Sequence, residues 1–224
     1  MYQGWSVSKA VRHLVSFNKG YRQALEEGYA NISALSRLIK PSVESMLGRE
    51  VTIDSIITSL KRMRAVAKPP SLQAVKVLAR SRLEVRTGIA KVTVKKNSQT
   101  KRIARDLATS SLGFFQLLDG VTSITLIVDL KNYEEVRQAF PPAFRISENT
   151  SMAALLVISP PKIAETPGVL SLILEHLARH EINVEEVVSC HTDTIILVRG
   201  VDGGRGFDVI HNLIALSKRL VQQR

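Results

Sequence analysis

The sequence has few of the residues that cross-link a chain, stack on bases or cross a membrane. It contains one cysteine, Cys190, which excludes an internal disulfide framework and indicates a reducing compartment. Aromatic residues make up 5% of the chain, and those near the N-terminus are expected in the core. No apolar run approaches the ~18 residues that span a bilayer, and residues 1–17 carry Lys9, Arg12 and His13 instead of a signal-peptide core. These absences predict a soluble, cytoplasmic protein.

Acidic residues are scarce in the first third of the chain. Residues 1–82 contain 14 Lys and Arg against 5 Asp and Glu, whereas residues 83–224 contain 17 against 15. The formal charge of +11 is therefore concentrated near the N-terminus. This asymmetry favours a polyanion or an acidic protein as the partner of that region, and a plainly solvated surface is the alternative.

Short amphipathic segments separated by breaks make up residues 1–68. Helical spacing extends over residues 5–24 and 32–39, Pro41 predicts a break before a short helix 41–47, and Thr52 caps a fourth helix, 53–66. Such a series is typical of a helix-turn-helix bundle, and it resembles the winged helix-turn-helix domains of prokaryotic regulators. Because aromatic residues that could stack on bases are sparse in this segment, double-stranded DNA is favoured over single strands. The candidate DNA contacts are Arg37, Lys40, Arg49, Lys61, Arg62 and Arg64. Complementation of the helix dipole is the other role open to the last three.

An ordered series of strand and helix patterns occupies the C-terminal third. The apolar run 153–158 predicts a buried strand, 169–178 an amphipathic helix, 184–189 and 194–198 a strand pair, and 207–221 a last helix. Strand, helix, strand, strand, helix is most of a split βαβ unit of the ferredoxin-like kind.

A short motif lies within this series, Thr166-Pro167-Gly168-Val169-Leu170 before the helix and Ile182-Asn183-Val184 after it. Residues 152–200 thereby resemble the ACT domain, the small-molecule regulatory module of aspartokinase and other amino-acid enzymes. The resemblance implies an effector bound at the loop before the helix and at an interface between two such domains. A helix start offers free N–H groups to a carboxylate, and Gly168 permits close approach. The predicted effector site comprises Thr166, Pro167, Gly168, Val169, Leu170, Asn183 and Val184.

Residues 83–150 repeat the element order in degraded form, with Lys95 to Thr100 in place of the Pro-Gly motif. The predicted fold class is α+β: a helix-turn-helix-like domain at 1–68, a linker or connecting helix at 69–82, and tandem ferredoxin-like βαββαβ domains. These are a degenerate ACT-like domain at 83–150 and an ACT domain at 151–224. Lys68-Pro69-Pro70, at the boundary between the helix-turn-helix-like domain and residues 69–82, is the clearest linker candidate. Because the chain ends in a helix where a strand is due, we expect Leu83 to Arg86 to supply the missing edge strand.

Three further sequence patterns are weaker indications of a functional site than the motif at Thr166 to Leu170. His176 and His180 share a helix face, yet packing or surface roles are favoured without a closely spaced cysteine pair, and neither metal nor cofactor is predicted. Gly203 to Gly206 is expected to form a strand-to-helix turn rather than a phosphate cradle. Cys190 is expected to be half-buried in a strand.

No arrangement of nucleophile, base and acid can be identified from spacing, so no catalytic residue is predicted and the chain is not expected to be an enzyme. The sequence predicts a homodimeric, amino-acid-responsive transcription regulator, with DNA bound by the N-terminal domain and the effector by the C-terminal one. The alternative is a stand-alone regulatory subunit of an amino-acid biosynthetic enzyme, which would not bind DNA.

Overall fold

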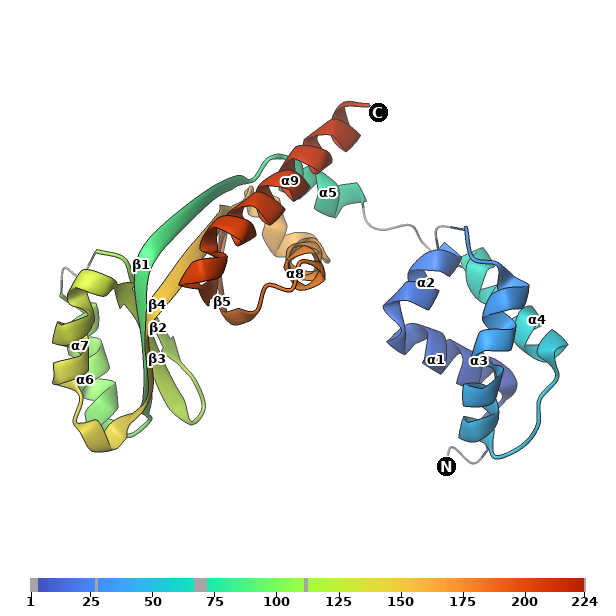
Figure 1. Ribbon diagram of the computed structural model, residues 1–224, viewed down its shortest axis with the longest axis horizontal. Helices are drawn as coiled ribbons and strands as arrows, with labels where there is room; N and C mark the ends of the chain where they lie inside the picture. Colours follow the sequence, from blue (N-terminus) through green and yellow to red (C-terminus); the bar gives the residue numbers. More distant parts are fainter. Residues whose placement is uncertain (1–3, 27, 67–71, 111–112, 224) are drawn as a thin grey trace. The chain divides into compact units, whose positions relative to one another are not determined.

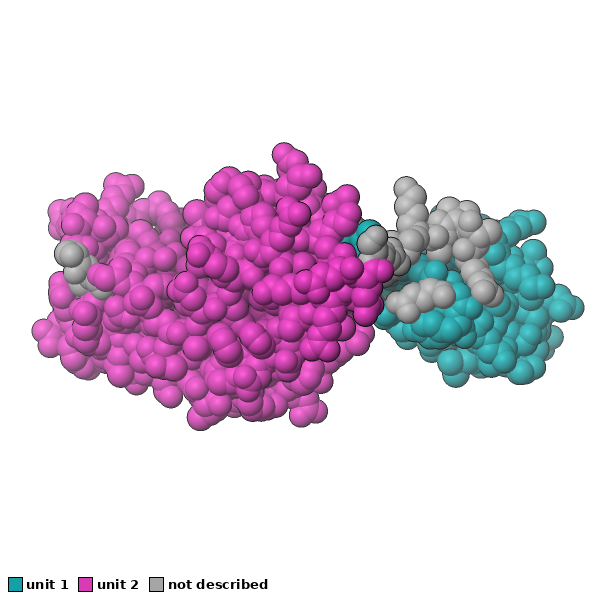
Figure 2. Space-filling view, turned by 90° about the horizontal axis from the view of Figure 1, so that it is seen from above, with its two compact units in different colours: residues 1–72 teal, residues 73–224 magenta. Residues whose placement is uncertain are grey.

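The computed structural model describes residues 4–26, 28–66, 72–110 and 113–223, and the predicted linker Lys68-Pro69-Pro70 lies outside these ranges. The chain divides into two compact units, residues 1–72 and 73–224 (Figure 2). Among the described residues, no helix has both the length and the apolar character needed to cross a membrane.

The described residues of the first unit form four helices, α1 (Val7–Phe17), α2 (Lys19–Glu26), α3 (Ile32–Leu47) and α4 (Ile53–Val66) (Figure 1). The helix expected over residues 5–24 is wrong as a single element. It is interrupted at Asn18, whose side chain accepts a hydrogen bond from Tyr21 N–H at 3.1 Å and so begins α2. No strand occurs in the described part of this unit, so the wing of a winged helix-turn-helix has no counterpart there.

The break predicted at Lys40-Pro41 is also wrong, because α3 continues through Pro41 to Leu47. Leu35, Ile39 and Val43 form an unbroken buried stripe across the proline, which itself is exposed. Proline inside a helix costs about 3 kcal/mol, and we attribute its tolerance here to burial of this stripe in the core of the unit. Gly48 then ends the helix with φ 65°.

The second unit is built on one six-stranded antiparallel sheet in the order β2-β3-β1-β4-β6-β5. The strands are β1 (Arg82–Lys95), β2 (Phe115–Asp119), β3 (Ser123–Asp129), β4 (Arg145–Ile158), β5 (Val184–Cys190) and β6 (Asp193–Arg199). Each half of the sheet therefore contains a strand pair of its own, β2-β3 or β6-β5, flanking the two central strands.

The central strands β1 and β4 are 14 residues long and belong to both halves. Arg82 to Arg86 of β1 pair with Ile158 to Ala154 of β4, which confirms that this segment completes the C-terminal half. The register shifts between Arg86 and Ile89, where Gly88 has φ 66°. The strand expected at 153–158 is too short, because β4 runs continuously from 145 to 158.

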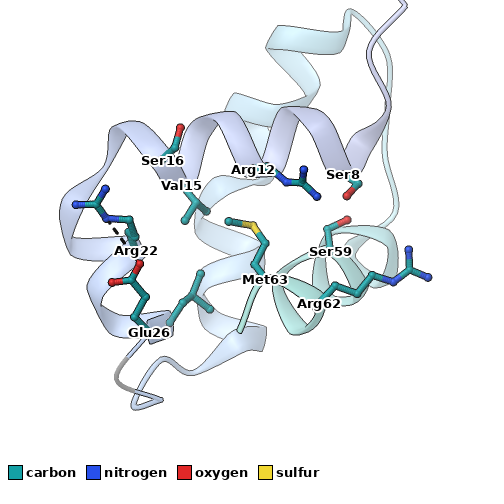
Figure 3. Close-up of a pocket in the computed structure, with 10 residues that line it drawn as sticks. Ser8, Arg12, Val15, Ser16, Arg22, Glu26, Ser59, Arg62 and Met63 are labelled. Carbon is teal, nitrogen blue, oxygen red and sulfur yellow. Dashed lines mark ion pairs between the residues drawn. The ribbon is translucent and has the colours of Figure 1, made fainter. Parts of the chain in front are cut away.

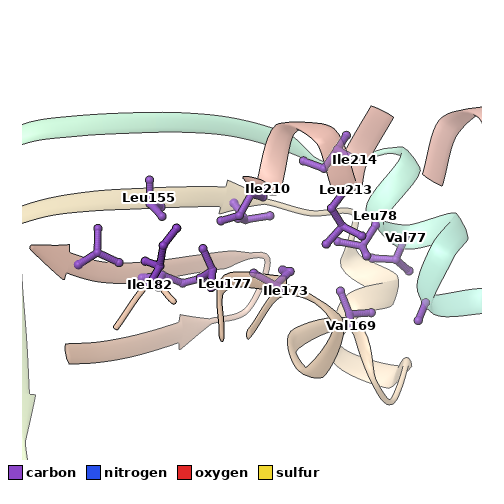
Figure 4. Close-up of a cluster of buried hydrophobic side chains, with 14 of the residues drawn as sticks. Val77, Leu78, Leu155, Val169, Ile173, Leu177, Ile182, Ile210, Leu213 and Ile214 are labelled. Carbon is purple, nitrogen blue, oxygen red and sulfur yellow. The ribbon is translucent and has the colours of Figure 1, made fainter. Parts of the chain in front are cut away.

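Helices pack on each half and form two cores. In the N-terminal half, α6 (Ser98–Ala108) and α7 (Tyr133–Ala139) cover β1 and β3. In the C-terminal half, α8 (Val169–Arg179) and α9 (Gly203–Gln222) cover β4 and β6 (Figure 4). Helix α5 (Leu72–Ala79) joins this second core through Ala74, Val77 and Leu78, and so packs into the unit rather than only connecting to it. Short 3-10 segments join the elements: η1 (Leu130–Asn132), η2 (Pro142–Phe144), η3 (Pro161–Glu165) and η4 (Gly200–Asp202).

The opposite face of the sheet carries a third buried cluster. Met152 and Ala154 of β4 belong to it, alternating with Ala153 and Leu155, which face the helices. The cluster also contains residues of β1, β3 and β6, so it extends across both halves. Lys91 Nζ of β1 lies 2.7 Å from Glu185 Oε2 of the edge strand β5, and this ion pair reaches across β4 and β6.

Glycines bring the start of α9 close to β4. The helix begins at Gly203, so the loop expected at Gly203 to Gly206 is wrong. A Cβ atom at Gly203 would lie 2.8 Å from Ala153 Cβ, and one at Gly206 would lie 2.7 Å from Leu155 Cδ1, whereas one at Gly204 would meet nothing within 4 Å. Gly203 and Gly206 therefore allow α9 to pack closely against β4.

Candidate functional site

The loop before α8 is held by its own backbone. Pro160 leads into the 3-10 segment η3, and the N–H of Thr166 donates to the carbonyl of Ile163 at 3.3 Å. The Thr166 hydroxyl donates to the carbonyl of Lys162 at 2.7 Å. The loop therefore arrives at Pro167-Gly168 in a defined conformation, with both residues exposed.

Gly168 is the N-cap of α8 and has φ 93° and ψ −8°, in the left-handed region. A Cβ atom there would meet nothing within 4 Å, so backbone conformation rather than crowding requires the glycine. Its carbonyl accepts from Leu172 N–H at 3.0 Å, but no N-cap side chain hydrogen-bonds to the first turn. This helix start therefore presents uncapped N–H groups together with the positive end of the helix dipole.

The start of α6, at the corresponding place in the N-terminal half, is closed by its own side chains. Asn97 Oδ1 accepts from Thr100 N–H at 2.9 Å, and Thr100 Oγ1 accepts from Asn97 N–H at 2.9 Å. This capping box satisfies two donors that an anion would otherwise use. The two halves thus share an element order but differ in what their first helix offers to a ligand.

The structure brings together only some of the predicted site residues. Thr166, Pro167, Gly168 and Leu170 lie at the start of α8, together with the backbone of Val169, whose side chain is 1% exposed and belongs to the core. Asn183 and Val184 lie beyond the other end of this helix, at the start of β5. Eleven helical residues rise about 16 Å, so within one chain these two groups do not share a site.

The other singled-out side chains have local roles. His176 Nδ1 and His180 Nδ1 each lie 2.8 Å from a backbone carbonyl one turn earlier, those of Leu172 and His176. Within the described ranges, no group of three potential metal ligands occurs. Cys190, expected to be half-buried, is exposed at the end of β5 because it sits where the edge strand turns back.

Arg205 also has a local role. Its Nη2 donates to the carbonyl of His180 at 2.8 Å, and its Nη1 lies 3.3 Å from Asp202 Oδ1. The Asp202 carboxylate is buried, with 3% of its side chain exposed, and it also pairs with Arg199. These contacts fix the end of α8 against the start of α9, so the arginine of the glycine-rich segment is already engaged.

The candidate DNA-binding cations are spread over α3, α4 and the turn between them. Arg37, Arg49, Lys61 and Arg62 are exposed, and Lys40 pairs with Glu44 at 3.4 Å. The side chain of Arg64 lies outside the described residues. The carboxylate of Glu44 also accepts a hydrogen bond from Val51 N–H at 3.0 Å, which together with Lys40 lowers the Glu44 pKa below its ordinary value. The turn that presents Arg49 is therefore tied to α3.

Comparison with known proteins gives a fold but no family. No family model matches the sequence, and no curated protein matches it. The chain is similar in structure to the regulatory subunit of aspartate kinase from Thermus thermophilus, with 13% identity, a TM-score of 0.50, and coverage of 58% of this chain and 95% of that one. The regulatory subunit from Thermus flavus gives 12% identity, a TM-score of 0.51, and coverage of 58% and 95%.

Aspartate kinase from Synechocystis gives 16% identity and a TM-score of 0.52, and the match covers 73% of this chain and 31% of that one. The chain thus spans about a third of the length of that enzyme. At these identities the likeness shows a shared fold, an α+β arrangement of the ACT-like kind.

Proposed function

We propose that this chain is an amino-acid-responsive regulatory protein whose second unit binds its effector at the start of α8. The observation that carries the proposal is the uncapped, glycine-containing helix start at Pro167-Gly168, set against the capping box that closes the start of α6. The fold that this chain shares with regulatory subunits of aspartate kinase supports it.

The proposed binding mode uses backbone more than side chains. The effector carboxylate accepts hydrogen bonds from N–H groups of the first turn of α8, where the helix dipole favours negative charge. Thr166 and Leu170 flank this position, and Val169 contributes only its main chain because its side chain is buried. Pro167 restricts the loop to one conformation.

Asn183 and Val184 are proposed to contact the effector that is bound by a second copy of the chain. Because they lie a helix length from Gly168 in their own chain, we propose that a homodimer brings them to the effector held by the partner copy. The edge strands β2 and β5 offer unpaired backbone groups for such an association. Light scattering at micromolar concentration should give a dimer, and a monomer would remove this part of the proposal.

The two halves of the sheet are proposed to be two interleaved ACT-like units, with only the C-terminal one binding effector. The N-terminal half has the order strand, helix, strand, strand, helix, strand from β1 to β4. The C-terminal half has the order strand, helix, strand, strand, helix from β4 to α9, and its remaining strand is supplied by β1, which precedes all of these elements in the chain. The proposal assigns the chain no catalytic step.

For the first unit we propose duplex DNA as the partner, contacted by the exposed cations Arg37, Arg49 and Lys61 together with the other candidate contacts. The alternative is that these helices dock on a biosynthetic enzyme. The shared fold with aspartate kinase regulatory subunits is the specific observation that favours this alternative.

A thermal-shift screen with the twenty amino acids tests the effector. A ligand present at a hundred times its Kd should stabilise the protein by about 2.7 kcal/mol. Gly168→Val should abolish this stabilisation, because a β-branched residue strongly disfavours φ 93° and would alter the loop. Gly48→Val is the matched control, since Gly48 also has positive φ and open space around it but lies in the other unit. Normal binding by Gly168→Val in calorimetry would exclude this site.

Binding to random duplex DNA across a salt series tests the partner of the first unit. The logarithm of the binding constant should fall with that of salt concentration, with a slope of about −0.9 per phosphate contact. A Lys61/Arg62/Arg64→Ala variant should bind more weakly and with a flatter slope. If affinity and slope are both unchanged, the cations serve a protein partner and the enzyme-subunit alternative takes precedence.

A further inference from the structure

A cleft of about 520 Å³ lies within the first unit, between α1, α2 and α4 (Figure 3). Volumes of about 300–1,000 Å³ are typical of sites for small molecules. Its lining includes Ser8, Arg12, Val15, Ser59, Arg62 and Met63. The lining residues that belong to α1 recur at helical spacing on one face of that helix, and the same holds for those of α4. The cleft is therefore formed by the packing of helices and not by loops.

The two ends of the cleft differ in charge. Arg12 of α1 and Arg62 of α4 extend to the end where the hydroxyls of Ser8 and Ser59 also lie (Figure 3). At the opposite end Arg22 lies 3.9 Å from Glu26 within α2, so its charge is already balanced.

Neither guanidinium at the first end has a carboxylate partner among the described residues. The ion pairs of the described part of unit 1 are Arg22–Glu26 and Lys40–Glu44, and both lie elsewhere. Two exposed arginines thus line the same end of one cavity, which places positive charge without a described carboxylate partner beside a concave surface. A guanidinium binds carboxylate or phosphate oxygens through parallel N–H donors, so this end is suited to an anionic group.

The middle of the cleft is apolar. Val15 and Leu25 line it from the core with almost no exposed surface, and the half-buried side chain of Met63, which lies between α1 and α4, presents the apolar surface that a ligand can contact (Figure 3). Methionine adapts its shape to irregular apolar partners. A ligand that fills this part of the cleft therefore has a hydrocarbon body.

We propose that this cleft binds a small organic anion, with its phosphate or carboxylate group on Arg12 and Arg62 and its hydrocarbon body against Met63. The site is separate from the effector site proposed at α8 and belongs to the other unit. Arg62 thereby acquires a role in addition to the contact with DNA assigned to it from the sequence.

Methionine methyl groups give a direct readout in the full chain. The sequence has four methionines, of which Met63 lines the cleft, Met46 packs in the core of the same unit and Met152 is buried in the other unit. With the methyls isotopically labelled, phenyl phosphate or benzoate should shift the Met63 resonance and leave those of Met46 and Met152 unchanged. Comparison of the two probes identifies the preferred anionic group, and inorganic phosphate should bind more weakly because it lacks the apolar body.

Charge variants complete the test. Arg12→Gln and Arg62→Gln should each weaken binding of the better probe by roughly tenfold, because each removes a charge-assisted contact. Arg37→Gln, also an exposed arginine but outside the cleft, should have no effect, and Gly168→Val should bind the probe normally. Binding of benzyl alcohol as tight as that of phenyl phosphate would overturn the proposal, as would insensitivity to both cleft variants or the lack of a Met63 shift. If inorganic phosphate binds equally well and a DNA duplex displaces it, the arginines serve a nucleic-acid backbone and the proposal also fails.

Discussion

Alanine substitutions along the first turn of α9 test whether its glycines are needed for contact with the sheet. Gly203 and Gly206 face β4, while Gly204 points away from it into open space. All three lie in the same helix, so they share the same backbone conformation and differ mainly in what a new methyl group would meet. The series therefore separates packing from helix propensity.

The magnitudes follow from the distances. At Gly203 a methyl would lie 2.8 Å from Ala153 Cβ, which has no rotamer to change, so the helix or the strand must move. Overpacking of this kind costs about 1–3 kcal/mol, and the better helix propensity of alanine returns up to about 1 kcal/mol. We expect Gly203→Ala to destabilise by roughly 0.5–2 kcal/mol. Gly206→Ala should cost a similar amount, because Leu155, which it would meet at 2.7 Å, is fully buried.

Gly204→Ala should instead stabilise by up to about 1 kcal/mol, since only the propensity changes. Urea and thermal denaturation followed by circular dichroism measure the series, with about 2–4 °C expected per kcal/mol for a chain of this size. If Gly203→Ala and Gly204→Ala shift stability in the same direction and by the same amount, close approach of α9 to the sheet does not explain the glycines.

Three further substitutions test other contacts. The hydrogen bond from Val51 N–H lowers the pKa of Glu44 in the folded state. Ionised Glu44 therefore stabilises the first unit at pH values above its unfolded pKa of about 4.3. This stabilisation is lost as the pH falls through the lower pKa that Glu44 has in the folded state. Glu44→Gln should therefore weaken the acid dependence of unfolding below about pH 4.3, and an unchanged pH profile would contradict this. Lys91→Met should destabilise the second unit by about 1–2 kcal/mol in urea denaturation, because it leaves the partly buried Glu185 without its closest cation, and a change within error would show that the pair contributes nothing. Asn97→Ala should cost about 1 kcal/mol through loss of the α6 cap and leave effector binding intact, and reduced effector affinity in calorimetry would show that the two halves are coupled.

Regular periodicity predicted much of the second unit. Helix α8 and the pair β5-β6 lie within a few residues of the expected ranges, since each has an apolar pattern bounded by turn residues. The local sequence pattern gave wrong predictions where contacts between distant residues determine the secondary structure. Pro41 is a strong helix breaker in isolation, but the buried stripe around it overrides this tendency. Likewise, residues 147–151 look polar and loop-like, yet they form part of β4, in which Ser147, Glu148 and Asn149 pair with β1.

For the candidate sites too, features that depend on adjacent residues could be predicted from the sequence, and features that depend on long-range packing could not. The motif at Thr166 to Leu170 was identified from adjacent residues, and it does lie at a helix start. Two features of this site depend on how α8 packs: the side chain of Val169 is buried, and Asn183 lies a helix length from Gly168. The spacing of residues in the sequence does not predict that packing. The cleft could not be anticipated at all, because Arg12 and Arg62 are far apart in sequence and come to line one cleft only through the packing of α1 on α4.

The interleaving of β1 and β4 has a consequence for how the chain folds. The C-terminal half needs Arg82 to Arg86 and α5, which are synthesised before the whole of the N-terminal half. Its sheet cannot close until residues more than 60 positions apart meet, and the entropy cost of closing this loop slows folding. A fragment beginning at residue 151 would lack an edge strand and part of its core, so the two halves are expected to fold and unfold as one cooperative unit.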